Sequence, residues 1–173
     1  MLIRWLDGVA QREFMSGDKA GYTPEVDELD MQIIRFLLQD GRTPFAQLAK
    51  QLNISEATVH ARVSKLEDSG VIKGFTVIVD PDKLGLSLTA LVLIKTDPKR
   101  TQHVFSRLAE MNEVIELYDV TGDYYGVAKI LVRDHHELGR FLDKIGLFDG
   151  VTSTNTLVVL KKIKETNIIR VGY

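Results

Sequence analysis

The chain has 173 residues, of which 45% are hydrophobic and 27% are charged, and its formal net charge is -2. These values are ordinary for a globular protein with a buried core, and the length suits one large domain or two small ones. The chain has no cysteine, which excludes disulfides, thiolate metal sites and cysteine nucleophiles. The start lacks the pattern of a secretion signal, and no apolar run approaches the roughly 20 residues that span a bilayer. We therefore expect a cytoplasmic protein with no membrane partner.

Residues 1–23 combine a short amphipathic stretch with a polar segment that contains glycine. The stretch is too short to form a stable helix without packing against something. Met15, followed by Ser16 and Gly17, resembles an ordinary start of a chain. We therefore predict that residues 1–23 are an N-terminal extension to the fold.

Residues 24–74 have the apolar spacing of three helices. Thr23-Pro24 predicts an N-cap and a first-turn proline for the first helix, and Thr43-Pro44 repeats this pattern for the second. Ser55 predicts the N-cap of the third helix, and Gly70 its left-handed C-terminal stop. Three helices of this size, the last two joined by a tight turn, form a helix-turn-helix domain. Its apolar side chains are Val26, Leu29, Ile33, Ile34, Leu37, Leu38, Phe45, Leu48, Ala49, Leu52, Val59, Val63 and Leu66.

The periodicity changes after residue 74. Val71-Ile72 and Phe75 to Val79 predict short extended segments, so residues 75–87 are expected to form a short β linker. Residues 88–165 then predict the order βαββαβ, which is that of a ferredoxin-like (ACT-like) domain, and the fold class is α+β. The six runs are Leu88 to Lys95, 104–111, Val114 to Val120, Tyr124 to Val132, 138–145 and Thr152 to Leu160.

Two helices on one side of such a sheet leave its other face bare, and a bare apolar sheet face normally finds a partner. We therefore expect residues 88–165 to be an oligomerisation domain. Residues 166–173 are a C-terminal tail whose apolar side chains suggest packing on the protein, as a further strand.

The third helix has the composition of a recognition helix, which docks by an apolar side and enters the major groove by short or polar side chains. Ala57 and Ala61 allow close approach to the bases, and His60 is able to hydrogen-bond a base edge or a phosphate. The remaining cations and Thr58 are better suited to phosphate contacts, which position the protein without specifying sequence. The predicted DNA-binding residues are Arg42, Ser55, Glu56, Ala57, Thr58, His60, Ala61, Arg62, Ser64, Lys65 and Lys73.

The segment from Arg42 to Phe75 holds five Lys or Arg against three Asp or Glu. Because this patch is only weakly basic, we expect a monomer to bind DNA poorly and a dimer to read two half-sites. An alternative is that the three helices mediate protein contacts. In that interpretation Glu56 favours the helix dipole, and Arg62 forms a salt bridge inside the domain.

Thr121-Gly122-Asp123 lies between two predicted strands, where a tight connection is typical. Glycine lets backbone N–H groups approach a ligand carboxylate, and Asp123 is able to hold an ammonium group. A row of hydroxyls follows on the last strand. From the residues alone, a hairpin turn and an exposed threonine-rich strand are the plainer interpretation.

A long pattern runs through both halves of the chain. It comprises Leu29-Asp30, Ile34, Leu37 to Thr43, Leu48-Ala49, Leu52, Ser55, Thr58-Val59, Arg62-Val63, Leu66-Glu67, Gly70 to Phe75, Val79-Asp80-Pro81, Lys83-Leu84-Gly85 and Thr121 to Tyr124. Over roughly residues 27 to 165, the chain resembles the Lrp/AsnC (leucine-responsive/asparagine regulator, feast/famine) family. The resemblance implies dimers built through the second domain, often assembling to tetramers or octamers, and control by an amino acid or similar small metabolite bound between dimers.

The resemblance also implies an effector site, because the family's pocket uses this loop and this strand. The predicted effector-binding residues are Thr121, Gly122, Asp123, Tyr124, Thr152, Ser153, Thr154 and Thr156. Tyr125 and Gly126 depart from the family, which usually has a second acid and then an aromatic residue there. Whether an effector binds, and which one, therefore stays open, with lysine, glutamine, leucine and tyrosine all candidates.

Other chemistries find no support in the pattern. The run Asp134 to Glu137 contains two histidines, but its spacing matches no standard zinc site and is typical of a solvated helix start with a capping box. Phosphate-loop and nucleophile-elbow motifs are absent from the sequence. We therefore expect no metal, no cofactor and no enzymatic activity.

The sequence thus predicts a transcription regulator that binds double-stranded DNA as a dimer. Effector binding is expected to change the association of dimers, with repression as the expected output. One alternative is a metabolite-binding allosteric module that acts on another protein without binding DNA. A second is an architectural DNA protein without sequence preference, against which the weak basic charge argues.

Overall fold

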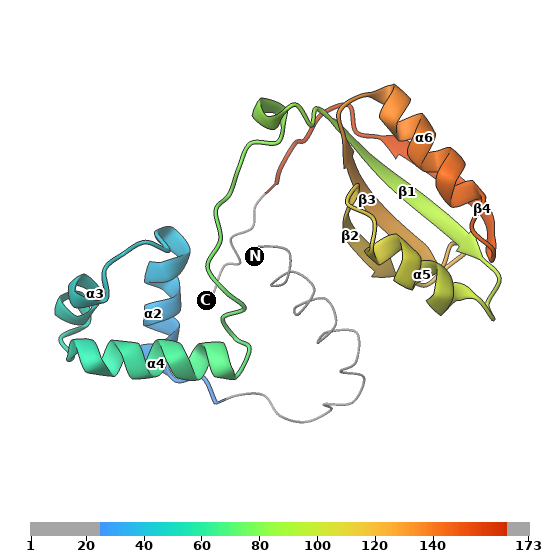
Figure 1. Cartoon of the computed structure of the whole chain (residues 1–173). Coiled ribbons are helices and arrows are strands. Elements are labelled where there is room, and N and C mark those ends of the chain that lie inside the picture. The colour runs from blue at the N-terminus through green and yellow to red at the C-terminus, as the bar shows by residue number, and fades with distance from the viewer. Residues whose placement is uncertain (1–24, 166–173) are drawn as a thin grey trace. The chain divides into compact units, whose positions relative to one another are not determined.

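The protein was analysed as a computed structural model, which describes residues 25–165 in two compact units, 25–76 and 77–165 (Figure 1). The predictions for residues 1–23 and for the tail at residues 166–173 lie outside the described residues. No helix of the described part is long and apolar enough to cross a membrane.

The first unit consists of three helices, α2 (Glu28–Gln39), α3 (Phe45–Leu52) and α4 (Glu56–Asp68). Their apolar sides meet in one core, as the 3.6-residue spacing of the apolar positions predicts. Its buried members are Ile33, Leu37, Leu48, Ala49, Val59 and Val63.

The start of α2 corrects the prediction of an N-cap at Thr23. Its N-cap is Asp27, whose carboxylate accepts from the backbone N–H of Asp30 at 2.9 Å. The Asp30 carboxylate accepts in return from the Asp27 N–H at 3.2 Å. This reciprocal capping box satisfies two amides, so the helix begins at Glu28 and not at Pro24, which itself lies outside the described residues.

The start of α3 also differs from the prediction. Its N-cap is Pro44, and no side chain caps it. The Thr43 hydroxyl instead donates to the carbonyl oxygen of Asp40 at 2.8 Å, so it closes the turn after α2. Ser55 does cap α4, as predicted, because its Oγ accepts from the Thr58 N–H at 3.0 Å.

The segment after α4 contains one confirmed prediction and one that was wrong. Gly70 has a φ of 75°, and the N–H of Ile72 donates to the Leu66 carbonyl at 3.0 Å, which closes the helix end. The short extended segments predicted from Val71 to Val79 form no strand in the described chain. A β-strand needs a neighbouring strand with which its backbone groups form hydrogen bonds, and within residues 25–165 this segment has no such neighbour. Its side chains are correspondingly exposed, as for Val77, which is 81% exposed.

The second unit has the predicted βαββαβ order. Its elements are β1 (Leu88–Thr96), α5 (Thr101–Ala109), β2 (Val114–Asp119), β3 (Gly126–Val132), α6 (His135–Gly146) and β4 (Val151–Val158), preceded by the 3-10 helix Asp82–Leu84. The strands form one antiparallel sheet in the order β2-β3-β1-β4.

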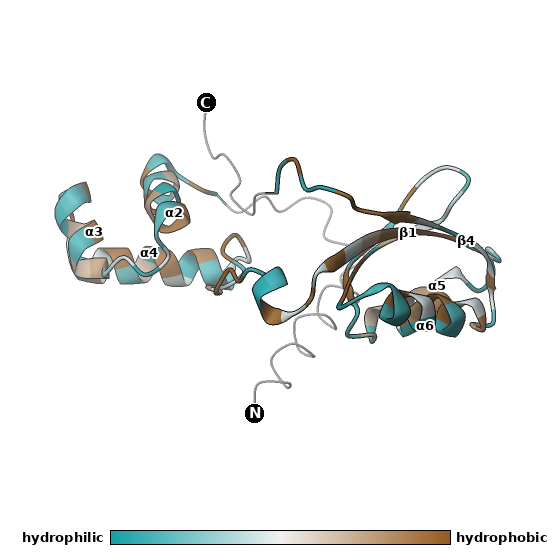
Figure 2. Cartoon of the chain, turned by 90° about the horizontal axis from the view of Figure 1, so that it is seen from above, coloured by the Kyte–Doolittle hydropathy of each residue, from teal (hydrophilic) through white to brown (hydrophobic). Residues whose placement is uncertain are grey.

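Both helices of this unit cover the same face of the sheet (Figure 2). Alternate residues of β1 and β3 point into this layer, including Val92 and Ile130, and they pack on Leu108 and Phe141. The intervening residues point to the open face, where Leu91 and Leu93 of β1 oppose Lys129 and Val127 of β3. The second unit therefore has one buried face and one face without cover from its own helices.

The segment Asp134 to Glu137 forms the start of α6. The Asp134 carboxylate accepts from the Glu137 N–H at 2.8 Å, and the Glu137 carboxylate accepts from the backbone N–H of Arg133 at 2.7 Å. Within the described residues, no group of three histidine or acidic side chains is arranged to hold a metal ion. The carboxylates of this segment therefore stabilise a helix start.

Candidate nucleic-acid interface and effector loop

Helix α4 displays the side chains that a recognition helix needs. Val59, Val63 and Leu66 are buried on its inner side. The outward side carries the exposed residues Ser55, Glu56, Ala57, His60, Ala61, Ser64 and Lys65. Two alanines in the middle of this surface leave the backbone accessible to a groove, so the arrangement suits close approach to base edges.

The ring of His60 is held in place at the surface. It packs edge-on against Phe45, with ring centroids 4.7 Å apart, and its Nε2 lies 3.9 Å from Oε1 of Glu56. The side chain is still 63% exposed, so its position is restricted but its polar atoms remain accessible. The helical spacing indicates only a core position for Phe45 and does not reveal its contact with His60.

The basic side chains predicted to bind phosphates differ in whether they form ion pairs within the protein. Arg62 forms ion pairs with Asp27 and, at 3.1 Å, with Asp30. The hydrogen bond to Asp27, and then that to Asp30, hold the pKa of Arg62 above its usual range. Arg62 thus follows the alternative interpretation, a salt bridge inside the domain. Arg42 is exposed.

Three other predicted contacts lie at the surface of this unit. Lys65 is exposed, although its Nζ donates to the carbonyl oxygen of Glu25 at 3.2 Å. Lys73 is also exposed. Thr58 is half-buried, and its hydroxyl lies 2.7 Å from Oγ of Ser55, which ties both hydroxyls to the start of α4.

The loop between β2 and β3 is anchored at its base and exposed at its tip. The N–H of Val120 donates to the Tyr125 carbonyl at 2.9 Å, and the Tyr125 N–H donates to the Ile94 carbonyl at 3.0 Å. Thr121, Gly122 and Asp123 are exposed, and Tyr124 is half-buried. Gly122 has a φ of 118°, a conformation that favours glycine.

The hydroxyls of β4 do not form the single row that the sequence suggested. Thr154 and Thr156 pair with Ile94 and Val92, so they lie on the helix side of the sheet, whereas Ser153 pairs with Lys95 on the open side. The hydroxyl of Thr152 donates to the Lys95 carbonyl at the register shift. Side chains of a strand alternate between faces, so adjacent hydroxyls cannot share one.

The glycine at position 126 has a local structural reason. A Cβ at this position would lie 2.7 Å from Cε1 of Phe105, so only glycine fits beneath that ring without a shift. Phe105 is itself buried in the core of the second unit. Gly126 is therefore matched to the packing of this chain, a relation that its sequence position does not reveal.

Comparisons with known proteins identify both units. Residues 26–73 match the family described as winged helix-turn-helix DNA-binding, and residues 89–169 match the Lrp/AsnC ligand binding domain. The chain is 45% identical over 141 residues to the HTH-type transcriptional regulator FL11 of Pyrococcus horikoshii, covering 82% of this chain and 93% of that protein. It is 41% identical over 140 residues to LrpA of the same organism, covering 80% and 99%.

Solved structures agree with these matches. AsnC of E. coli superposes with a TM-score of 0.80 at 33% identity, covering 84% of this chain and 99% of that one. A regulator from Neisseria meningitidis, solved as a complex with L-Met, has the same fold, with a TM-score of 0.78 at 23% identity over 84% and 97% of the two chains. The curated relatives are transcription regulators and not enzymes, as the sequence predicts. The chain belongs to the Lrp/AsnC family of transcription regulators.

Proposed function

We propose that this regulator is a homodimer that places α4 of each subunit in successive major grooves of double-stranded DNA and responds to a small effector with an amino-acid head group. The observation that carries the proposal is the outward side of α4, where Ala57, His60 and Ala61 lie exposed above a fully packed inner side. Helices of this kind read base edges, and their spacing in a dimer sets half-sites about 34–36 Å apart. A cytoplasmic location is part of this proposal, because the protein must have access to DNA.

The open face of the sheet supports self-association. Leu157 is half exposed there, beside the partly exposed Leu91 with which it pairs. Lys129 on the same face is paired with Glu116 at 3.0 Å and with Glu165 at 2.8 Å, so its charge is already compensated within the chain. A largely apolar face with compensated charge is suited to burial against a second copy. Assembly of dimers to tetramers or octamers follows from the family resemblance.

The exposed loop at Thr121, Gly122 and Asp123 supports effector binding. Its backbone N–H groups are able to meet a carboxylate, and the Asp123 carboxylate is able to meet an ammonium group. The bound L-Met of the structural relative from Neisseria is such a molecule. Binding at this loop is expected to change dimer association, and through it the number of operator half-sites that one particle occupies.

The test is binding of the full chain to a fluorescent duplex from the upstream region of its own gene, in competition with a shuffled duplex. We expect preference for the upstream sequence, affinity that falls steeply with salt, and loss of the preference in Ala61→Glu. The matched control is Gln102→Glu, which adds the same charge at an exposed position of α5 in the other unit.

Equal affinity for both duplexes would contradict sequence-specific reading and favour an architectural DNA protein. No binding to either, together with binding of an amino acid, would favour the metabolite-binding module. For the effector, titration of the complex with leucine, lysine, glutamine, tyrosine and methionine should change the assembly state. Asp123→Ala should remove that response.

A further inference from the structure

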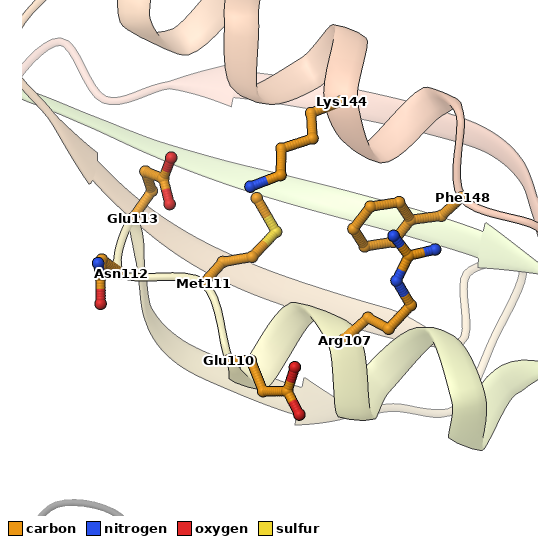
Figure 3. Close-up of a pocket in the computed structure, with 7 residues that line it drawn as sticks. All are labelled: Arg107, Glu110, Met111, Asn112, Glu113, Lys144 and Phe148. Atoms are coloured by element: carbon orange, nitrogen blue, oxygen red, sulfur yellow. The ribbon is translucent and has the colours of Figure 1, made fainter.

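The outer side of the helical layer of the second unit contains a pocket that lies between the C-terminal ends of α5 and α6 (Figure 3). Its volume is about 350 Å³, near the lower end of the roughly 300–1,000 Å³ typical of small-molecule sites. It is lined by Arg107, Glu110, Met111, Asn112, Glu113, Lys144 and Phe148. All of these residues belong to one unit, so the pocket is complete within a single chain.

Arg107 lines this pocket with its guanidinium against an aromatic ring. Its guanidinium carbon lies 3.7 Å from the centroid of the Phe148 ring, and Figure 3 shows the two groups stacked. Stacking restricts the guanidinium to one plane and leaves the N–H donors at its edge available. A planar fork of donors matches the two oxygens of a carboxylate.

The other charged side chains at the pocket are unpaired in the part of the chain that the structure describes. Within residues 25–165, the side chains of Lys144, Glu110 and Glu113 form no ion pair or hydrogen bond. Figure 3 shows Lys144 reaching from α6 toward Met111, on the side where Glu113 also lies. Charges of both signs therefore surround one opening without neutralising each other.

We propose that this pocket binds a small zwitterion, an α-amino acid with a short side chain. Arg107 and Lys144 would receive the carboxylate, and Glu110 and Glu113 the ammonium group. The lining carries two cations and two anions, so a neutral dipolar molecule satisfies both, whereas an ion of either sign leaves two like charges facing it. The buried Met111 and Phe148 form an apolar floor for the ligand's carbon atoms.

This pocket is separate from the effector loop. Asn112 and Glu113 precede β2, whereas Thr121 follows it. A strand of six residues is about 20 Å long, so the two sites lie at opposite ends of β2. The zwitterion site goes beyond the proposed function, because it requires neither DNA binding nor the loop.

The experiment is equilibrium dialysis of the full chain against radiolabelled glycine, L-alanine and L-serine, in the background of Asp123→Ala. At least one of the three should still bind, at one molecule per chain. Lys144→Met and Glu113→Gln should each weaken that binding about tenfold or more, since each removes a charge-assisted partner. Lys99→Met and Asp143→Asn are the matched controls, because both residues are exposed and lie outside the lining.

Acetate and ethylamine distinguish the ligand class. A tenfold excess of either should displace little of the bound amino acid, because each offers only one of the two charges. The proposal is overturned if none of the three amino acids binds, if Asp123→Ala abolishes all binding, if Lys144→Met has no effect, or if acetate competes as well as the amino acid. A chain that binds the amino acid at this pocket but does not bind DNA would contradict the proposed function alone.

Discussion

Arg62 and Arg42 carry the same charge in the same unit, but they are held differently. Arg62 is engaged with Asp27 and Asp30, and the Asp30 side chain is 0% exposed. Removal of Arg62 would leave a buried carboxylate without its cation, which costs stability. The side chain of Arg42 is exposed and has no partner within the described residues, so it remains available to a phosphate.

We therefore expect Arg62→Met to lower the thermal midpoint of unfolding, with little change in the salt dependence of DNA affinity. Arg42→Met should leave the midpoint unchanged and reduce the slope of log affinity against log salt by about one. Circular dichroism melting and anisotropy titrations at several salt concentrations measure the two effects. The reverse pattern would show that Arg62, and not Arg42, contacts the phosphates.

Replacement by alanine should have opposite effects on the free energy of unfolding at two glycines of the second unit. Gly126→Ala should destabilise by about 1–3 kcal/mol, because the added methyl overlaps the Phe105 ring. Gly139→Ala in α6 should stabilise by about 0.5–1 kcal/mol, because nothing lies within 4 Å of the new Cβ and alanine favours a helix.

Urea unfolding of both variants measures these differences. Adding Phe105→Leu to Gly126→Ala should recover part of the lost stability, since the smaller side chain makes room for the methyl. If Gly126→Ala proves neutral on its own, the ring has another place to move, and the packing explanation for this glycine is wrong.

At the scale of the element, helices α2 and α6 begin at carboxylates, whereas α4 begins at the hydroxyl of Ser55. The backbone N–H of Glu137 holds the pKa of Asp134 below its usual value, and that of Asp30 does the same for Asp27. The folded state therefore binds fewer protons at these groups than the unfolded chain. Their contribution to stability is complete above the unfolded pKa of about 3.9 and is lost as the pH falls through the lower, folded value.

The matched variant is Asp134→Ser, which keeps an oxygen acceptor for the helix start but does not titrate. We expect its free energy of unfolding to be close to that of the parent at pH 7 and to fall less steeply between about pH 4 and pH 2. Urea unfolding at each pH measures the slope. An unchanged slope would mean that Asp134 has the same pKa in the folded and unfolded states.

At the scale of the whole molecule, the sheet has two faces with different partners. Leu157 on β4 is 50% exposed, and Leu147 after α6 is 87% exposed on the helical side. If two chains associate through the open face, only the first of these leucines is buried by assembly. Replacing an exposed leucine by a charged residue should then disrupt the dimer only if the leucine lies on the open face of the sheet.

We expect Leu157→Glu to shift the protein from dimer to monomer and to weaken DNA binding, whereas Leu147→Glu should change neither. Light scattering after size-exclusion chromatography gives the mass of each variant. Both positions are exposed in the single chain, so each variant should keep its fold, which far-ultraviolet circular dichroism verifies. A Leu157→Glu protein that remained dimeric would place the interface elsewhere.

Much of the fold follows from local patterns in the sequence. Apolar spacing located the helices that became α2, α3 and α4, because burial of one side is a property of a segment. The change of period after residue 74 and short runs of β-type residues located the four strands. The predictions that Ser55 caps α4 and that Gly70 ends it were correct, because capping depends on a few adjacent residues. The predicted start of α2 was wrong for a related reason. The sequence offers two local cap signals, Thr23-Pro24 and the capping box at Asp27, which lies four residues further along.

The candidate site was less accessible from the sequence. The outward side of α4, with His60 and Ala61, follows directly from the helical period. The pairing of Arg62 with Asp27 joins residues 35 positions apart, and no local signal distinguishes it from an exposed cation. The dense spacing of the β4 hydroxyls predicts one row, but the register with β1 places Ser153 on the opposite face from Thr154 and Thr156.

The sequence by itself determined that this chain has a helical unit with a recognition helix and an α+β unit of the Lrp/AsnC type, because these depend on periodicity and on short motifs. Only the tertiary structure decided which charges are compensated, why residue 126 is glycine, and that Arg107 and Lys144 share a pocket with two glutamates. The physical reason is distance along the chain: such contacts form between segments that meet only when the whole unit has folded.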